Sequence, residues 1–293
     1  MTSAPGRAGP REALAPRDGR LAIICGGGDF PLVLARAAKE AGRDPFLVGV
    51  TGSADKRIEA FAHVWVGLGE VGKFLKALRA HGVVDVAMVG AINRPEFGDL
   101  RFDFGAAKII PTLAASFRGG DNRLLATVAR LMEREGFRVV AAHEVAPQLL
   151  TPAGTLTRHA PSAEALADAR YGEAIIGALS PFDVGQAVVV ANRRVLAVEA
   201  AEGTDAMLAR VAEMRAAGDL RLEGRAGVLV KCPKSAQELR VDLPAVGIQT
   251  IAAARDAQLA GVALAAGKTL LIDRQACVRA ADEAALFVYG MER

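Results

Sequence analysis

Long apolar runs and an excess of one charge are both missing from this chain of 293 residues. No apolar stretch reaches the roughly 18 residues that a membrane-spanning helix requires, so we expect no transmembrane segment. The chain has 36 Lys and Arg against 33 Asp and Glu, which gives a formal net charge of +3. Its basic residues cluster only locally, whereas nucleic-acid-binding domains concentrate them on one face. We therefore expect no nucleic-acid partner.

Cysteine and histidine are also scarce. The three cysteines lie far apart and form neither a CxxC pair nor an even disulfide framework, which is typical of reduced thiols in a cytoplasmic protein. No two of the four histidines are spaced i and i+4, and the sequence contains neither HExxH nor GxSxG. The histidines therefore do not resemble a zinc site, and the nucleophile turn of the α/β-hydrolases is not indicated.

The chain divides into a leader and two regions of different character. Residues 1–19 are polar and rich in Pro and Arg, and they lack the apolar centre of a secretory signal, so we expect a disordered leader. Residues 20–150 and 163–293 alternate segments typical of strands and helices, which suits helices packed on a sheet. Residues 151–162 contain two prolines and a glycine, which is typical of a linker.

The region 20–150 has the pattern of a Rossmann-like domain. We expect strands at 21–25, 45–50, 63–66, 83–89 and 139–142, and helices at 31–41, 72–81 and 122–135. This alternation predicts a parallel, doubly wound sheet. Ligand-facing groups gather at the carboxyl ends of such strands, so residues 26–29 and 90–94 should lie near each other in one crevice.

The region 163–293 predicts a distinct, mixed α/β domain. We expect helices at 163–179, 204–217 and 250–260, a hairpin of 186–191 with 195–200, and short strands at 227–230, 263–264 and 269–272. The terminal stretch LFVYGMER, residues 286–293, is apolar enough to be a core strand or part of a homodimer interface. The sequence leaves both alternatives open.

The stretch CGGGDFP places a glycine-rich turn between a strand and a helix. Backbone N–H groups in such a turn can approach a phosphate at the positive end of the helix dipole, which makes Gly27 and Gly28 candidate ligands. The turn matches neither GxGxxG nor GxxxxGK[ST], and the carboxylate of Asp29 would repel a diphosphate. A tight turn without any ligand also explains the glycines.

Two further turns in the first region carry polar side chains. GAINRP follows a buried strand and offers Asn93 and Arg94 to a phosphate or carboxylate, and a plain turn before Pro95 is the alternative. RGGDNRLL places Asp121 where it would cap the following helix. A cap that faces a crevice can also contact a ligand.

The stretch VEAAEGTDAML gathers carboxylates around the start of a helix. Thr204 is a candidate N-cap, and acids near a helix N-terminus are favourable by about 0.3–1 kcal/mol each. That effect explains Asp205 well but explains Glu199, at the end of an apolar strand, much less well. Together with Glu202, these carboxylates would suit a hard divalent cation.

The stretch VLVKCPKSAQELRVDLPAVG combines cations with a carboxylate. Lys231 and Lys234 follow a buried strand, and extended backbone would place Arg240 and Asp242 on one face with their apolar neighbours on the other. An edge strand protected by charge is one explanation. A site for a phosphate and its metal ion is the other, because phosphate binds cations and Mg²⁺ binds carboxylates.

Taken in order, GGGDFP, GAINRP, GGDNRLLATVARLMEREGF, DVGQAVVV, VLAVEAAEGTDAMLAR and VLVKCPKSAQELRVDLPAVG resemble the LpxI family of UDP-2,3-diacylglucosamine pyrophosphatases. The resemblance runs from about Leu21 to Tyr289. It implies a Rossmann-like N-terminal domain, a distinct α/β C-terminal domain and a substrate between them. The implied reaction is the Mg²⁺-dependent hydrolysis of UDP-2,3-diacylglucosamine to UMP and 2,3-diacylglucosamine 1-phosphate (lipid X), in the lipid A pathway of Gram-negative bacteria.

The resemblance also implies roles for individual residues. Implied catalytic residues are Asp242, Lys231 and Arg240. Implied substrate contacts are Gly27, Gly28, Asp29, Asn93, Arg94, Asp121, Gln186, Thr204 and Lys234. Implied metal ligands, for Mg²⁺ or Mn²⁺, are Asp242, Glu202 and Asp205. Phe182 and Met207 are candidates for contact with the acyl chains, and a lipid substrate implies transient contact with the inner-membrane surface.

Two other function classes remain open at this point. Another nucleotide-sugar or dinucleotide-binding enzyme would also begin with a Rossmann-like domain. It would need a ribose-binding acid after the second strand, where the sequence offers only Thr51 and Asp55. A non-catalytic ligand-binding protein with the same two domains is the third class.

Overall fold

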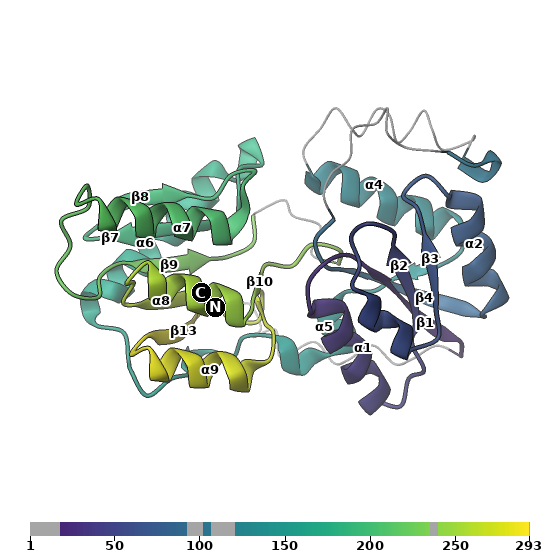
Figure 1. Cartoon of the computed structure of the whole chain (residues 1–293), viewed down its shortest axis with the longest axis horizontal. Helices are drawn as coiled ribbons and strands as arrows, with labels where there is room; N and C mark the ends of the chain where they lie inside the picture. The colour runs from purple at the N-terminus through teal and green to yellow at the C-terminus, as the bar shows by residue number, and fades with distance from the viewer. Residues whose placement is uncertain (1–17, 93–101, 107–120, 235–239, 293) are drawn as a thin grey trace, which may run out of the picture.

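The computed structural model describes residues 18–92, 102–106, 121–234 and 240–292. Two α/β halves lie side by side (Figure 1), one built mainly from the first half of the sequence and one from the second. The predicted leader lies almost wholly outside the described residues. Across the residues that are described, no helix is long and apolar enough to cross a membrane.

The N-terminal half contains a five-stranded sheet in the order β3-β2-β1-β4-β5. All of its pairings are parallel. The chain order reverses between β1 and β4, which is the doubly wound arrangement that the alternating pattern predicts. The strands are β1 (Arg20–Cys25), β2 (Phe46–Val50), β3 (His63–Val66), β4 (Val83–Val89) and β5 (Arg138–Val139).

Helices cover both faces of this sheet (Figure 1). The long helices are α1 (Phe30–Glu40), α2 (Val71–Ala80) and α4 (Asp121–Arg134), and α5 (Ala142–Val145) is a single turn. Apolar residues of α1 and α5, such as Leu34 and Val145, pack in one core cluster with Ile23 of β1. Residues of α2 and α4, such as Leu78 and Ala129, pack in another. The three predicted helices are thus confirmed to within one residue.

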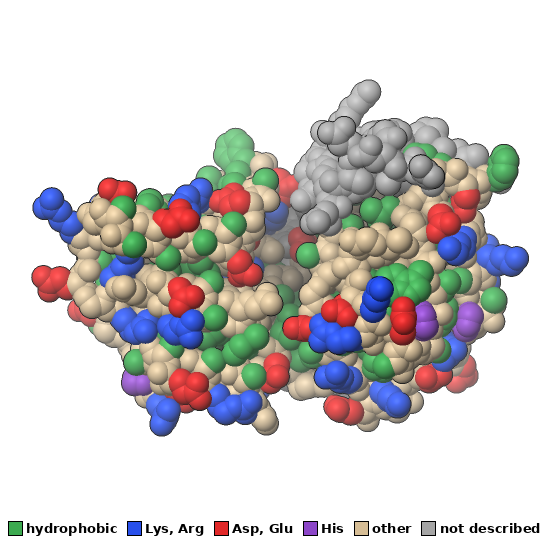
Figure 2. Space-filling view, in the orientation of Figure 1, with side chains coloured by type: hydrophobic (Ala, Val, Ile, Leu, Met, Phe, Trp, Pro, Cys, Tyr) green, Lys and Arg blue, Asp and Glu red, His purple; other side chains and the backbone are tan. Residues whose placement is uncertain are grey.

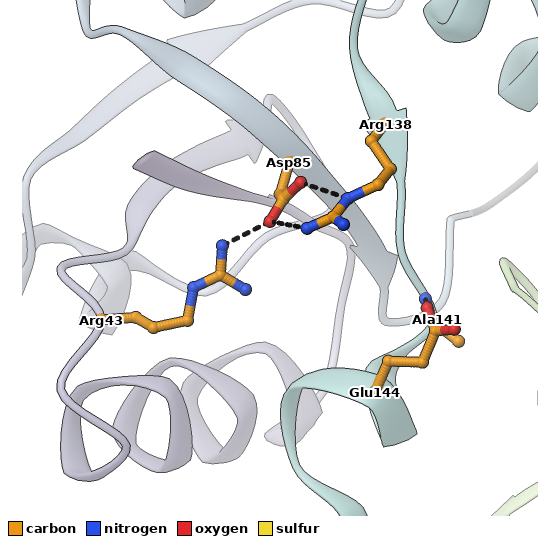
Figure 3. Close-up of polar contacts among 5 residues, drawn as sticks. All are labelled: Arg43, Asp85, Arg138, Ala141 and Glu144. Carbon is orange, nitrogen blue, oxygen red and sulfur yellow. Dashed lines mark hydrogen bonds and ion pairs between the residues drawn. The ribbon is translucent and has the colours of Figure 1, made fainter. Parts of the chain in front are cut away.

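An ion cluster around a buried carboxylate joins the start of β4 to neighbouring segments (Figure 3). Asp85 of β4 is fully buried and accepts hydrogen bonds from Arg138 at 2.7 Å and from Arg43 at 2.6 Å. Burial alone would raise the pKa of Asp85, but the hydrogen bonds and charges of the two arginines outweigh it and lower that pKa. Close by, the Glu144 carboxylate accepts a hydrogen bond from the backbone N–H of Ala141 at 2.8 Å. The cluster fixes β5 and the turn after α1 against β4.

The C-terminal half contains a six-stranded sheet in the order β6-β13-β11-β9-β7-β8. Strands β9, β11 and β13 are parallel, and β7 and β8 form the predicted antiparallel hairpin. The strands are β6 (Gly154–Thr155), β7 (Ala187–Ala191), β8 (Arg194–Val198), β9 (Val228–Lys231), β11 (Gly261–Ala265) and β13 (Phe287–Met291). Because β13 lies between β11 and β6, the core-strand alternative for the terminal stretch is confirmed. Homodimer formation stays a prediction.

Three helices cover one face of this sheet, and α6 (Ala163–Leu179) covers the other. The three are α7 (Gly203–Ala216), α8 (Ile248–Asp256) and α9 (Arg274–Glu283), which Figure 1 shows stacked in order. Met207 of α7 is fully buried in their shared core. The expectation that it contacts acyl chains is therefore wrong, because no surface of its side chain is accessible.

Two described segments lie where the halves meet. Within the predicted linker 151–162, β6 pairs with β13 of the C-terminal sheet. Farther along, β10 (Ala245–Val246) pairs with β12 (Leu270–Leu271). Just before β10, Val241 and Leu243 pack against the two core clusters of the N-terminal half. Their predicted packing against a core is confirmed, although both are only partly buried and residues 240–241 form a turn and not a strand.

Candidate active site

The glycine-rich turn of the N-terminal half contacts the loop after β4, as predicted. Gly27 donates a backbone hydrogen bond to Ala91 at 2.6 Å, and Gly26 donates one to Val89 at 2.8 Å. A Cβ atom on Gly26 would lie 2.6 Å from the carbonyl oxygens of Gly90 and Ala91, so this close approach requires glycine. These two N–H groups already have acceptors. Asn93 and Arg94 lie outside the described residues, and their roles stay predictions.

A cation that the sequence analysis did not identify offsets the charge of Asp29. Arg57 forms ion pairs with Asp29 at 2.5 Å and with Asp55 at 2.8 Å. Hydrogen bonds from the side chain and the backbone of Arg57 lower the pKa of Asp55 to about 2. Asp55 also caps the short helix η1 (Lys56–Ala60). The expected repulsion of a diphosphate by Asp29 is therefore reduced.

Four ends of secondary structure converge at one edge of the C-terminal sheet. Lys231 ends β9, Glu199 follows β8, Gln186 precedes β7, and Thr204 lies in the first turn of α7. Because β7 is antiparallel to both β8 and β9, its start lies at the edge where the other two end. The sheet topology thus brings together residues that are up to 45 positions apart in the sequence, from Gln186 to Lys231.

Three of these residues form a buried polar chain. The exposed fractions of Glu199, Thr204 and Lys231 are 6%, 8% and 6%. The Lys231 Nζ donates to Thr204 Oγ1 at 2.7 Å, and Thr204 Oγ1 donates to Glu199 Oε1 at 2.6 Å. The expectation that Thr204 caps α7 is wrong, since the N-cap residue is Glu202. The hydroxyl of Thr204 instead accepts from Lys231 and donates to Glu199.

Two further predicted residues act on Lys231. Burial lowers the pKa of Lys231, and the negative charges of Glu199, Asp205 and Asp242 oppose that effect. Asp205 accepts a hydrogen bond from the Thr250 hydroxyl at 3.1 Å, which ties it to α8. The structure thus brings together Thr204, Asp205, Lys231 and Asp242, although Asp242 arrives from a separate segment.

The predicted metal ligands belong to separate contacts in this structure. Asp205 accepts a hydrogen bond from Thr250, and the charge of Asp242 acts on Lys231. Within the described ranges, no group of three or more His, Cys, Asp or Glu side chains is arranged to hold a metal ion. Glu202 lies in an ion pair with Arg210 at 3.0 Å. Its role as a metal ligand stays a prediction.

The other predicted cations have acceptors of their own. Lys234 pairs with Asp183 at 2.5 Å, and Arg240 pairs with Glu133 of α4 at 2.5 Å. The Arg240 pair links the C-terminal segment to the N-terminal half. Figure 2 shows the surface hollowed between the two halves, with acidic and basic side chains at its rim.

The remaining predicted contacts are only partly defined. The backbone N–H of Gln186 donates to Glu199 Oε2 at 2.8 Å, and its carbonyl accepts from the N–H of Cys232 at 3.1 Å. Asp121 begins α4, but its side chain lies outside the described residues. Phe182 is 76% exposed on the surface.

Sequence reasoning noticed Glu199 but did not assign it to the site. The available signal was a charged residue at the end of an apolar strand. The burial of Glu199 in the structure shows that this signal was informative. Arg57, Asp183 and Glu133 were missed. They act through partners distant in sequence, and only the fold reveals those partners.

Comparison with known proteins finds matches to both halves of the chain. The family model described as the LpxI N-terminal domain matches residues 20–149, and the LpxI C-terminal domain matches residues 152–289. A protein from Caulobacter vibrioides named UDP-2,3-diacylglucosamine pyrophosphatase LpxI is 42% identical over 273 residues, which cover 93% of this chain and 98% of that protein.

Among solved structures, a GalE-like L-threonine dehydrogenase from Cupriavidus necator in its holo form aligns with 92% of this chain and 96% of its own. Its identity is 15% and its TM-score is 0.30, values too low to support an argument. The two domain matches and the similarity to the Caulobacter protein cover nearly the whole chain after its first residues. The chain belongs to the LpxI family.

Proposed function

We propose that this chain hydrolyses the diphosphate bond of UDP-2,3-diacylglucosamine and releases UMP and lipid X, a step of lipid A biosynthesis. The observation that carries the proposal is the buried Lys231, which lies among the charges of Glu199, Asp205 and Asp242. A buried cation next to carboxylates is suited to phosphoryl chemistry, in which charge develops on phosphate oxygens. The name of the Caulobacter relative supports the choice of substrate.

In this proposal the cations bind the diphosphate by exchanging partners. Lys234 and Arg240 each pair with a carboxylate in this structure. A diphosphate carries more charge than either carboxylate and would compete with both for these cations. Lys231 is already fixed by Thr204, so its ammonium can stabilise the transition state without reorganising.

Asp242 is the proposed residue that orients the attacking water. Its neighbours Val241 and Leu243 pack against the N-terminal half, while its charge acts on Lys231 of the C-terminal half. Asp242 is therefore held between the halves, where the resemblance implies that the substrate binds. A carboxylate fixed in this way can accept a hydrogen bond from water and direct its oxygen toward a phosphorus atom.

We further propose that Asp205 and Asp242 hold Mg²⁺, with Mn²⁺ as a substitute. The donor set is oxygen only, as hard divalent cations prefer, and the charges of both carboxylates act on the same ammonium. Mg²⁺ is commonly bound by one or two carboxylates together with substrate phosphates and water. When bound, the ion would neutralise charge on the phosphate oxygens.

The lipid substrate leads us to propose a cytoplasmic enzyme with transient contact at the inner-membrane surface. Two large apolar side chains support this contact, since Phe104 is 101% exposed and Phe182 is 76% exposed. Sedimentation with phospholipid vesicles tests it, and equal recovery of the protein in the supernatant with and without vesicles would contradict it.

The dinucleotide-enzyme alternative has little support from the site. The acid after the second strand that would bind a ribose is Asp55, which is occupied by Arg57 and by capping η1.

Product analysis decides between the function classes. Purified protein is incubated with UDP-2,3-diacylglucosamine and Mg²⁺, and the products are identified by mass spectrometry. We expect equimolar UMP and lipid X. Intact substrate after prolonged incubation with folded protein would contradict the proposed hydrolysis.

A further inference from the structure

The chain of hydrogen bonds from Lys231 through Thr204 ends at Glu199, a carboxylate that no proposed step uses. We infer that Glu199 and Thr204 are positioning residues, which hold the Lys231 ammonium in the orientation that the diphosphate requires. The inference rests on the proposed function and adds to it, because it places two buried groups behind the cation that meets the substrate.

The donor inventory fixes the direction of the chain. A lysine ammonium has three N–H donors and no acceptor, and a carboxylate has acceptors only. Thr204 Oγ1 therefore accepts from Lys231 at 2.7 Å and gives its single proton to Glu199 at 2.6 Å. A threonine hydroxyl can satisfy both partners at once, and valine, of the same shape, can satisfy neither. The two other N–H groups of Lys231 remain for other partners.

The Glu199 end of this series of hydrogen bonds is fixed to the sheet. The second oxygen of Glu199 accepts a hydrogen bond from the backbone N–H of Gln186 at 2.8 Å. The Glu199 backbone N–H donates to Ala187 at 2.9 Å. A Cβ atom on Gly185 would lie 2.2 Å from the Glu199 carbonyl oxygen, so the two strand ends approach as closely as glycine permits. Glu199 is therefore a rigid anchor, as a supporting residue should be.

The Lys231 end of this series of hydrogen bonds carries the more flexible side chain. Lysine has a long stem with many rotamers, and ordering it only when substrate binds would weaken binding or catalysis. In this structure the side chain is buried before any ligand arrives. Thr204 sets the direction of one N–H, while the charges of Asp205 and Asp242 also act on the same ammonium. The order imposed by Glu199 and Thr204 is thus in place in advance.

Hydroxyl removal at Thr204 tests the inference. Thr204→Val should lower kcat by about 10²-fold with KM within about threefold, as expected when an interaction serves the transition state. Thr204→Ser restores the hydroxyl and should recover at least about tenfold of that loss. Thr127→Val is the matched control, since Thr127 is also a buried threonine but lies on α4, and its kcat should match wild type.

A double variant tests whether the two residues act as one unit. Glu199→Gln keeps the shape of the side chain and removes its charge. The losses from Glu199→Gln and Thr204→Val should not add, so the double variant should be no slower than the slower single variant. Additive losses would mean that the two residues act independently.

A measurement that does not depend on activity separates this inference from the proposed function. In protein labelled with ¹⁵N at the lysine side chains, the Lys231 ammonium signal is identified by its loss in Lys231→Arg. It should be present in wild type and Thr204→Ser and broadened beyond detection in Thr204→Val. An unchanged signal in Thr204→Val, or a kcat within about threefold of wild type, overturns the inference. Wild-type protein that releases no UMP refutes the proposed function, and the ammonium signal then decides the positioning on its own.

Discussion

Arg240 and Glu133 form an ion pair across the two halves of the molecule, with 2.5 Å between Nη1 and Oε1. Arg240 belongs to the segment that carries Asp242, and Glu133 belongs to α4. Both side chains are partly exposed, so the pair adds little stability. The pair matters because the Glu133 carboxylate would compete with the substrate diphosphate for the same guanidinium.

Removal of the Glu133 carboxylate should therefore improve substrate binding. We expect Glu133→Gln to lower KM by about two- to fivefold with kcat unchanged, and Arg240→Ala to raise KM by about tenfold or more. Glu135→Gln is the matched control. Glu135 pairs with Arg79 at a distance of 2.5 Å, and neither residue belongs to the segment 240–246. Steady-state kinetics of UMP release measure all three variants. A KM for Glu133→Gln equal to that of the control would mean that this pair does not compete with substrate.

Asp242 should be essential for turnover and dispensable for folding. Its apolar neighbours, and not its own side chain, pack against the core clusters. Asp242→Ala should therefore unfold like wild type while kcat falls by about 10²- to 10⁴-fold. Asp256→Ala, which removes an exposed carboxylate paired with Arg255, should leave kcat unchanged. A kcat for Asp242→Ala near the wild-type value would remove Asp242 from the mechanism.

Activity should depend on a divalent cation. Protein treated with EDTA and freed of chelator should release no UMP, and Mg²⁺ or Mn²⁺ should restore the rate, because the proposed ligands are oxygen atoms. Circular dichroism of the metal-free protein serves as the control for folding. Full activity after metal removal would refute the metal site and with it the roles of Asp205 and Asp242 as ligands.

The arginines around Asp85 should stabilise the fold above acidic pH. Asp85→Asn should lower the free energy of unfolding at pH 7 by about 1–3 kcal/mol, because it leaves two partly buried cations without their carboxylate. Since folding lowers the pKa of Asp85, its contribution is complete above the unfolded pKa of about 3.9. It is lost as the pH falls through the folded value.

Urea unfolding of wild type and Asp85→Asn across this pH range measures the effect. The difference between the two proteins should shrink on acidification. Asp256→Asn, at an exposed position, should change stability by less than about 0.5 kcal/mol. Equal stability of Asp85→Asn and this control at pH 7 would contradict the account of the buried cluster.

The sequence alone predicts most of the elements because their signals are local. The alternation of apolar strands and capped helices fixes the Rossmann-like half, and α6 begins and ends at its predicted residues. α9 was missed because it is largely polar, and only Cys277 and Ala281 are buried. β12 lies within the predicted strand 269–272, whereas its partner β10 was missed because two residues are too few for a periodic pattern.

The candidate site was predicted in its residue types better than in its partners. Lys231 was recognised as a cation after an apolar strand, and Asp205 as one of the carboxylates around a helix start. In the fold the charge of Asp205 acts on Lys231. The packing of Val241 and Leu243 against the N-terminal half depends on the tertiary arrangement of two domains. An apolar residue in the sequence indicates burial but does not say which core receives it, as Met207 also shows.

The central claim is that the buried cation at the end of β9 promotes hydrolysis of the substrate diphosphate. Lys231→Met keeps much of the length of the side chain and removes its charge, while Lys39→Met on the exposed side of α1 is the control. The single measurement is kcat for UMP release from UDP-2,3-diacylglucosamine by folded protein with Mg²⁺. The account predicts a loss of at least about 10²-fold for Lys231→Met and none for Lys39→Met. A folded Lys231→Met variant with the wild-type kcat would contradict it.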